Sequence, residues 1–145
     1  MTDPNALTSL QLAVLNVLWD RGECTVPEVA AALAADRDLA PTTVATLLTR
    51  LDKRGYVERR RPVEPGSRAY LYRAIVDREA TRAGRARGLT EDLFEGKVGD
   101  LVHHLLASSE LEPGDLARVR ELIDGHAAAG KERREDRGTD GKEVR

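Results

Sequence analysis

The chain has 145 residues, enough for one ordinary domain or for a small domain with an accessory element. Hydrophobic residues make up 41% of it and aromatic residues only 3%, so we expect a core of Leu, Val and Ala. A single cysteine, Cys24, excludes an intrachain disulfide framework and a cysteine-rich zinc site. No apolar run approaches the roughly 18 residues that span a bilayer, and the N-terminus lacks a signal-peptide pattern. No membrane insertion and a cytoplasmic location are therefore expected.

The net charge of −2 conceals an uneven distribution. Residues 41–73 carry eight Lys and Arg against three acidic residues, whereas residues 1–40 and 74–130 are both acidic. Phosphate binding depends on locally placed cations, because that is where counterions are released. The basic stretch is therefore a candidate nucleic-acid surface. A solvated face with chance clustering explains the charge alone equally well.

Two helices are expected in the first forty residues. The segments Thr8–Gln11 and Thr25–Glu28 both have the form of a capping box, and apolar residues at helical spacing follow each of them. The first helix is predicted from Leu10 to Trp19. The second follows its capping box and ends near Ala35.

A third helix is predicted from Pro41 to the Arg54-Gly55 pair. One face carries apolar residues at i, i+3, i+4 and i+7, the spacing of a buried stripe, namely Val44, Leu47, Leu48 and Leu51. The opposite face is unusual, because threonine is a mediocre helix former and yet occurs four times in eight residues. That face consists of Thr42, Thr43, Ala45, Thr46, Thr49, Arg50 and Lys53.

Two extended segments follow the third helix. Residues 56–61 lead into a turn with two prolines and Gly66, and residues 68–73 alternate as a strand does. Together they predict a basic β-hairpin. Its cations include Arg59, Arg60, Arg61 and Arg68.

The pattern returns to helix from about Asp77, with four glycines as weak points, and a last helix is predicted from about Pro113 to Ala129. The apolar residues of this region have too little core of their own to bury, so pairing with a second copy is expected. The predicted dimerisation residues are Leu89, Leu93, Phe94, Val98, Leu101, Leu105, Leu116, Val119, Leu122 and Ile123. Residues 131–145 have no large apolar residue before Val144 and are predicted to be a disordered charged tail.

Three helices followed by a basic hairpin have the order of a winged helix-turn-helix. The expected fold is mainly α, with a DNA-binding domain over 1–75 and a helical dimerisation domain over 76–130. A recognition helix buries one stripe against its own domain and offers short polar and cationic side chains to the major groove. Arg50 and Lys53 are placed for phosphates or a guanine, and the hairpin for the DNA backbone or a minor groove. A three-helix domain with a solvated hairpin is the alternative.

A set of short motifs, in this order and spacing, resembles the penicillinase-repressor family (BlaI, MecI and CopY type). The resemblance covers about residues 7–124 and rests on Leu18-Trp19, Thr25-Val26-Pro27-Glu28-Val29, Pro41-Thr42-Thr43-Val44, Thr46-Leu47-Leu48-Thr49-Arg50-Leu51 and Phe94-Glu95-Gly96. It implies a homodimer whose C-terminal helices interlock and whose winged domains sit on a palindromic operator of double-stranded DNA. The family's DNA-contacting helix maps onto Thr42, Thr43, Ala45, Thr46 and Arg50. The methicillin-type members carry longer polar or basic side chains at positions 42 and 45.

Two regulatory features of the family do not carry over directly. Its penicillin-responsive members are cleaved at an Asn-Phe bond, and the corresponding bond here is His104-Leu105. Cleavage with the same specificity is therefore not expected, and a regulatory protease stays a candidate partner. The copper-responsive members carry a C-terminal Cys-x-Cys pair, which this tail lacks, so copper sensing by that route is excluded.

Catalysis finds no support in the sequence. No Ser, His and acid arrangement, phosphate-cradling glycine loop or metal-ligand spacing stands out, so no enzyme activity, cofactor or metal is expected. The predicted function is a dimeric transcriptional repressor that occupies its operator through the helix at about 41–54 and the wing at about 56–74. The alternatives are a protein-interaction adaptor on a winged-helix scaffold and a sensor that releases DNA when it binds a small molecule.

Overall fold

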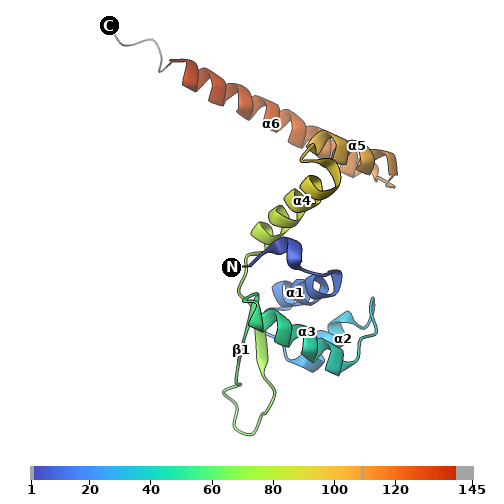
Figure 1. Cartoon of the computed structure of the whole chain (residues 1–145), viewed down its shortest axis with the longest axis vertical. Coiled ribbons are helices and arrows are strands. Elements are labelled where there is room, and N and C mark those ends of the chain that lie inside the picture. The colour runs from blue at the N-terminus through green and yellow to red at the C-terminus, as the bar shows by residue number, and fades with distance from the viewer. Residues whose placement is uncertain (1, 109, 140–145) are drawn as a thin grey trace. The chain divides into compact units, whose positions relative to one another are not determined.

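The computed structural model describes residues 2–108 and 110–139 (Figure 1). Its elements in chain order are the 3-10 helix η1 (Pro4–Ala6), the helices α1 (Ser9–Arg21), α2 (Val26–Leu33) and α3 (Pro41–Lys53), the strands β1 (Val57–Arg60) and β2 (Leu71–Ala74), and the helices α4 (Arg78–Phe94), α5 (Val98–Ser108) and α6 (Pro113–Thr139). The chain divides into two compact units, Met1–Val98 and Gly99–Arg145.

Local sequence sets the starts of α1 and α2, and both predicted capping boxes are confirmed. The Thr8 hydroxyl accepts a hydrogen bond from the Gln11 N–H at 3.2 Å, and the Gln11 side chain accepts from the Thr8 N–H at 3.0 Å. Thr25 and Glu28 form the same reciprocal pair at the start of α2. Each box satisfies two N–H groups that the first helical turn leaves without a partner.

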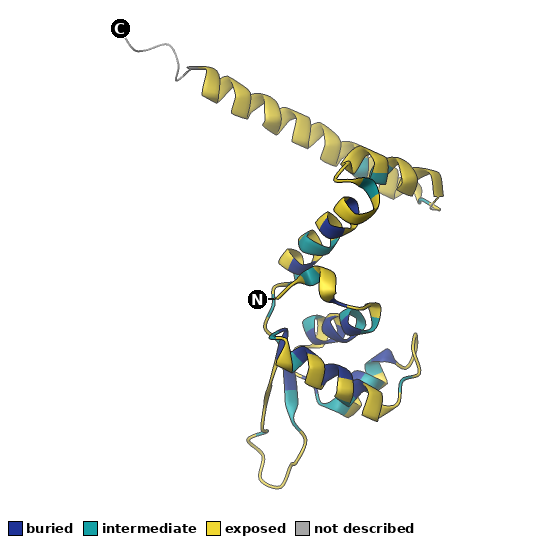
Figure 2. Ribbon diagram, viewed as in Figure 1, coloured by how far each residue is buried: buried dark blue, intermediate teal, exposed yellow. Residues whose placement is uncertain are grey.

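The core of the first unit forms around α3. Its predicted stripe is confirmed, since Val44, Leu48 and Leu51 have no exposed surface and Leu47 is only 8% exposed. Figure 2 shows buried residues along both α3 and α1. The other members of the core are Leu7, Val14, Leu15, Val17, Leu18, Cys24, Val29, Leu33, Tyr56, Val57 and Tyr72. The core therefore consists mainly of Leu and Val, as the composition predicts.

The predicted hairpin is present, with shorter strands than expected. β1 and β2 pair antiparallel, with Val57 opposite Ala74 and Arg60 opposite Leu71, so residues 61–70 form a long loop. A further bridge joins Tyr72 to Cys24, and no pattern in the sequence predicts it. The Cys24 N–H donates to the Tyr72 carbonyl at 3.0 Å, and the Tyr72 N–H donates to the Cys24 carbonyl at 2.8 Å. This bridge ties the base of the hairpin to the loop between α1 and α2.

Helices α4 and α5 are separated at only one of the predicted weak points. Glu95 and Gly96 have φ values of 52° and 78°, in the left-handed region that ends a helix. Gly84, Gly88 and Gly99 lie inside helices.

Helix α6 is longer than expected. It continues to Thr139, through residues 131–139 for which the sequence predicted disorder. The physical reason is that Lys, Glu and Arg are good helix formers, so the lack of apolar residues argues against burial and not against helix. Residues 140–145 of the predicted tail lie outside the described residues.

Truncating the buried stripe should destabilise the protein. Leu48→Ala removes a fully buried side chain, so we expect the free energy of unfolding to fall by about 3 kcal/mol. Thr49→Ala, on the exposed face of the same helix, should change it by less than about 0.5 kcal/mol. Urea unfolding followed by circular dichroism measures both. Equal effects of the two substitutions would contradict the assignment of the buried face.

Candidate nucleic-acid interface

The seven predicted residues of α3 share one face of the helix. Six of them are exposed, and the seventh, Ala45, is half-buried. The six are Thr42, Thr43, Thr46, Thr49, Arg50 and Lys53. Because the opposite stripe is buried in the core, this face must point into solvent.

Two of the threonine hydroxyls are engaged within the helix. The Thr46 hydroxyl donates to the Thr42 carbonyl at 3.0 Å, and the Thr49 hydroxyl donates to the Ala45 carbonyl at 2.9 Å. A hydroxyl that donates one hydrogen bond keeps lone pairs that can accept others. Thr46 and Thr49 therefore offer acceptors and methyl groups to a neighbouring molecule. The sequence alone does not distinguish between donor and acceptor roles for these two hydroxyls.

The wing arginines differ from one another in their partners. Arg60 forms a bidentate pair with Glu23, with Nε–Oε1 and Nη2–Oε2 distances of 2.7 and 2.5 Å. This hydrogen-bonded pair lowers the pKa of the Glu23 carboxyl. Arg59 lies 3.6 Å from Asp52 on α3, and its guanidinium stands 4.6 Å from the centre of the Tyr70 ring. Arg60 thus connects the wing to the loop before α2, and Arg59 connects it to α3.

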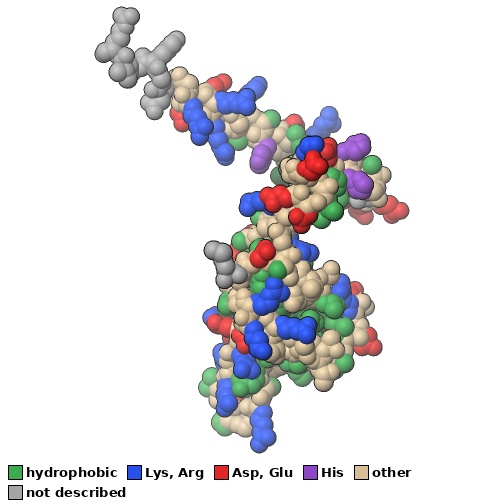
Figure 3. Space-filling model, viewed as in Figure 1, with side chains coloured by type: hydrophobic (Ala, Val, Ile, Leu, Met, Phe, Trp, Pro, Cys, Tyr) green, Lys and Arg blue, Asp and Glu red, His purple; other side chains and the backbone are tan. Residues whose placement is uncertain are grey.

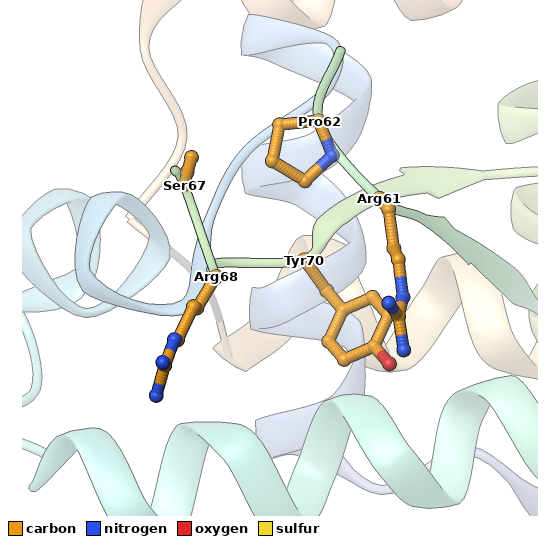
Figure 4. A pocket seen from close by; sticks show the side chains of 5 residues that line it. All are labelled: Arg61, Pro62, Ser67, Arg68 and Tyr70. Carbon is orange, nitrogen blue, oxygen red and sulfur yellow. The ribbon is translucent and has the colours of Figure 1, made fainter. Parts of the chain in front are cut away.

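Arg61 and Arg68 are the predicted wing cations without an acidic partner in the part of the chain that the structure describes. They line a hollow of about 320 Å³ together with Pro62, Ser67 and Tyr70. Figure 4 shows both arginine side chains extending to the same side of the hairpin as the Tyr70 ring. The Arg61 guanidinium is 5.9 Å from the centre of that ring. Two cationic side chains therefore extend in one direction beside the hollow. Figure 3 shows Lys and Arg side chains along this hairpin.

Sequence reasoning missed the residues that hold the wing cations. Glu23, Asp52 and Tyr70 each contact a predicted DNA-binding arginine. A predicted hairpin register could have identified Tyr70, because continuing the pairing of Arg60 with Leu71 by one position places Tyr70 opposite Arg61. Glu23 lies 37 residues before Arg60, and no local pattern connects the two.

The predicted dimerisation residues lie on α4, α5 and α6, and most are exposed. Leu93 is 67% exposed, Leu122 57% and Ile123 58%. Leu89, Val98, Leu105 and Leu116 are exposed as well, while Phe94, Leu101 and Val119 are partly buried. His104 and Leu105, the candidate cleavage position, both lie within α5.

Membrane-spanning and metal-binding features are both absent from the described residues. Within residues 2–108 and 110–139, no helix is long and apolar enough to cross a membrane. The same residues contain no group of three or more His, Cys, Asp or Glu side chains that could hold a metal ion.

Three helices followed by a two-stranded hairpin, with a polar and cationic face on the third helix, define a winged-helix DNA-binding protein. The sequence model described as "Penicillinase repressor" matches residues 7–125, so the chain belongs to the penicillinase repressor family. It is accordingly a DNA-binding transcriptional repressor and not an enzyme.

Individual relatives are distant but match most of the chain. The methicillin resistance regulatory protein MecI of Mammaliicoccus sciuri is 20% identical, over 81% of this chain and 92% of that protein. The penicillinase repressor of Bacillus licheniformis is also 20% identical, over 87% of this chain and 95% of that protein. A crystal structure of a mutant MarR from E. coli, complexed with operator DNA, aligns with a TM-score of 0.50. That alignment has 20% identity and covers 84% of this chain and 76% of that chain, and it supports the fold.

The pair between Glu23 and Arg60 predicts a measurable titration. The carboxyl of Glu23 should titrate below its ordinary pKa of 4.5, and Arg60→Ala should bring it back towards that value. Because the folded-state pKa is lowered, the pair stabilises the wing above pH 4.5 and is lost as the pH falls through the lowered value. Carbon-13 NMR of the carboxyl measures the shift. Arg61→Ala is the control and should leave the Glu23 titration unchanged; an equal effect of both substitutions would overturn the assigned pair.

Proposed function

We propose that this repressor acts as a homodimer on a palindromic operator, with residues 1–75 binding DNA and residues 76–130 pairing the two copies. The observation that carries the DNA-binding part is the exposed face of α3, where threonines and cations lie opposite a fully buried stripe. A helix with this division can enter a major groove while its other face stays packed on its own domain.

The proposed roles follow from the partners of each side chain. Arg50 is exposed and reads a guanine or binds a phosphate, and Lys53 at the end of α3 binds a phosphate. Thr46 and Thr49 accept hydrogen bonds from base amino groups or contact a thymine methyl. The remaining residues proposed on the helix face are Thr42, Thr43 and Ala45.

The wing is proposed to contact the DNA backbone or the minor groove through two of its arginines. Arg61 and Arg68 have no acidic partner among the described residues and point to the same side of the hairpin (Figure 4). Arg59 contributes while stacked on Tyr70. Arg60 acts indirectly, because its guanidinium is held by Glu23.

Dimerisation is supported by the exposed apolar side chains. In the described part of the Gly99–Arg145 unit no residue is buried, although α5 and α6 carry several leucines (Figure 2). Burying these leucines against a second copy removes apolar surface from water, and a two-fold dimer matches a palindrome. The dimer would occupy half-sites about one helical turn apart, or a multiple of it, and block transcription sterically in the cytoplasm.

The same arrangement offers a place for a regulatory protease. A cut at His104-Leu105 would separate α6 from the DNA-binding unit. Since this bond lies within α5, the helix must open before a protease can bind it in an extended form.

Operator binding tests the proposed recognition helix. Fluorescence anisotropy with the duplex upstream of the protein's own gene should show specific binding that weakens steeply with salt. Arg50→Ala should weaken it by about 10- to 100-fold, and Arg82→Ala, on the exposed surface of α4, should not. Equal affinity for a random duplex, with no effect of Arg50→Ala, would contradict the assignment. Binding of a protein partner that is insensitive to salt would favour an adaptor instead.

The oligomeric state tests the second half of the proposal. Introducing a charge at both Leu122 and Ile123, by substitution with Asp, should convert the dimer to a monomer because two apolar side chains at the interface become charged. Sedimentation equilibrium measures the mass. Ala128→Asp on the same helix is the control and should leave the dimer intact. A monomeric wild type would exclude the dimer.

A further inference from the structure

The N-terminal segment, residues 2–7, is held by three side chains from two parts of the first unit, the junction between α3 and β1 and the helix α4. The Asp3 carbonyl accepts a hydrogen bond from the Tyr56 hydroxyl at 2.5 Å. The Ala6 carbonyl accepts from Arg54 Nη1 at 3.3 Å, and the Leu7 carbonyl accepts from Arg85 Nη1 at 2.9 Å. Arg54 caps the C-terminal end of α3, whereas Arg85 lies on α4. The segment therefore lies between the end of the recognition helix and α4.

Two glycines of α4 allow this segment to approach closely. A Cβ atom on Gly84 would lie 2.7 Å from the Pro4 Cγ, and a Cβ atom on Gly88 would overlap the Asn5 side chain. The two glycines are four residues apart and so lie on the same face of the helix. Glycine is unfavourable inside a helix. The close contact with Pro4 and Asn5 explains why both positions carry it. From the sequence alone they are only weak points of the predicted helix.

Further contacts hold both the N-terminal segment and the start of α4 in place. Leu7 is 3% exposed and belongs to the core, which anchors the segment to the rest of the DNA-binding domain. At the start of α4, Arg78 pairs with Asp20 at 2.7 Å, and the Trp19 indole donates to the Val76 carbonyl at 3.0 Å. These contacts hold α4 where it begins. The N-terminal segment adds a second attachment one to three turns further along.

We propose that residues 2–7 form a strap that fixes the direction in which α4 leaves the DNA-binding domain, residues 1–75, with Arg54, Tyr56 and Arg85 as positioning residues. The proposal rests on the dimeric function above. If the copies pair through residues from α4 onward, the direction of α4 sets the distance and rotation between the two recognition helices. The strap thereby sets which spacing of half-sites the dimer accepts.

Operators that differ only in half-site spacing test this role. Each inserted base pair moves the half-sites apart by about 3.4 Å and rotates them by about 35°. The full chain should lose about tenfold or more in affinity for each such insertion or deletion. A chain lacking residues 2–6 keeps Leu7 and the Thr8 cap, and should bind an isolated half-site as tightly as the full chain while discriminating spacings by less than about threefold. A general loss of stability would instead lower the affinity for the isolated half-site together with the affinity for the two-site operators.

Point variants provide the matched comparison and cover the case in which the shortened chain does not fold. Gly84→Leu should displace the strap, and Arg85→Ala should remove one of its hydrogen bonds, so both should relax the spacing preference. Arg82→Ala is the control, because the Arg82 guanidinium pairs with Glu79 on the same helix.

The outcomes separate the strap from the dimer. If the full chain discriminates spacings and the strap variants do so equally sharply, the strap has no positioning role. If the full chain binds two half-sites no better than one, the dimeric function itself is wrong and the inference falls with it. Relaxed spacing with unchanged half-site affinity in the strap variants supports the inference.

Discussion

The packing of one stripe of α3 is the constraint on which the rest of the molecule depends. Val44, Leu48 and Leu51 have no exposed surface, and they lie in a core shared with α1, α2 and the base of the hairpin. A helix with 3.6 residues per turn that buries this stripe must turn its opposite face to solvent. The position of Arg50 and the threonines is thus a consequence of the core. A surface held in this way needs no ordering before it meets a partner, which supports its proposed role in DNA binding.

The electrostatics of the wing are more selective than its composition suggests. Residues 41–73 carry eight Lys and Arg, but Arg59, Arg60 and Arg73 are each paired with an acidic residue. A paired cation at the surface still has a structural use, because Arg59 and Arg60 fix the hairpin to its neighbours and Arg73 joins its two strands. Fewer cations are then available to displace counterions from DNA than the sequence alone predicts. The salt dependence of binding should reflect this smaller number.

The sequence was a good guide wherever the cause is local. Thr8 and Thr25 predicted two helix starts, and the spacing of the α3 leucines predicted the buried face. It failed where distant segments meet. The bridge between Cys24 and Tyr72, and the strap on Gly84 and Gly88, join segments far apart in the chain and leave no periodic signal. The long α6 shows a different limit, since a segment without apolar residues can still form a helix.

The most direct test of the central claim is to map the DNA contact on the full chain by NMR. Titrating the operator duplex into nitrogen-15-labelled protein should produce the largest amide shift changes in two segments, residues 42–53 on α3 and 59–68 on the wing. Within α3, the amide signals of the buried stripe should shift less than those of the exposed face. The amide signals of residues 26–33 of α2 should change little. Changes confined to α2, α5 or α6, with α3 unaffected, would contradict the claim that the exposed face of α3 is the DNA-binding surface.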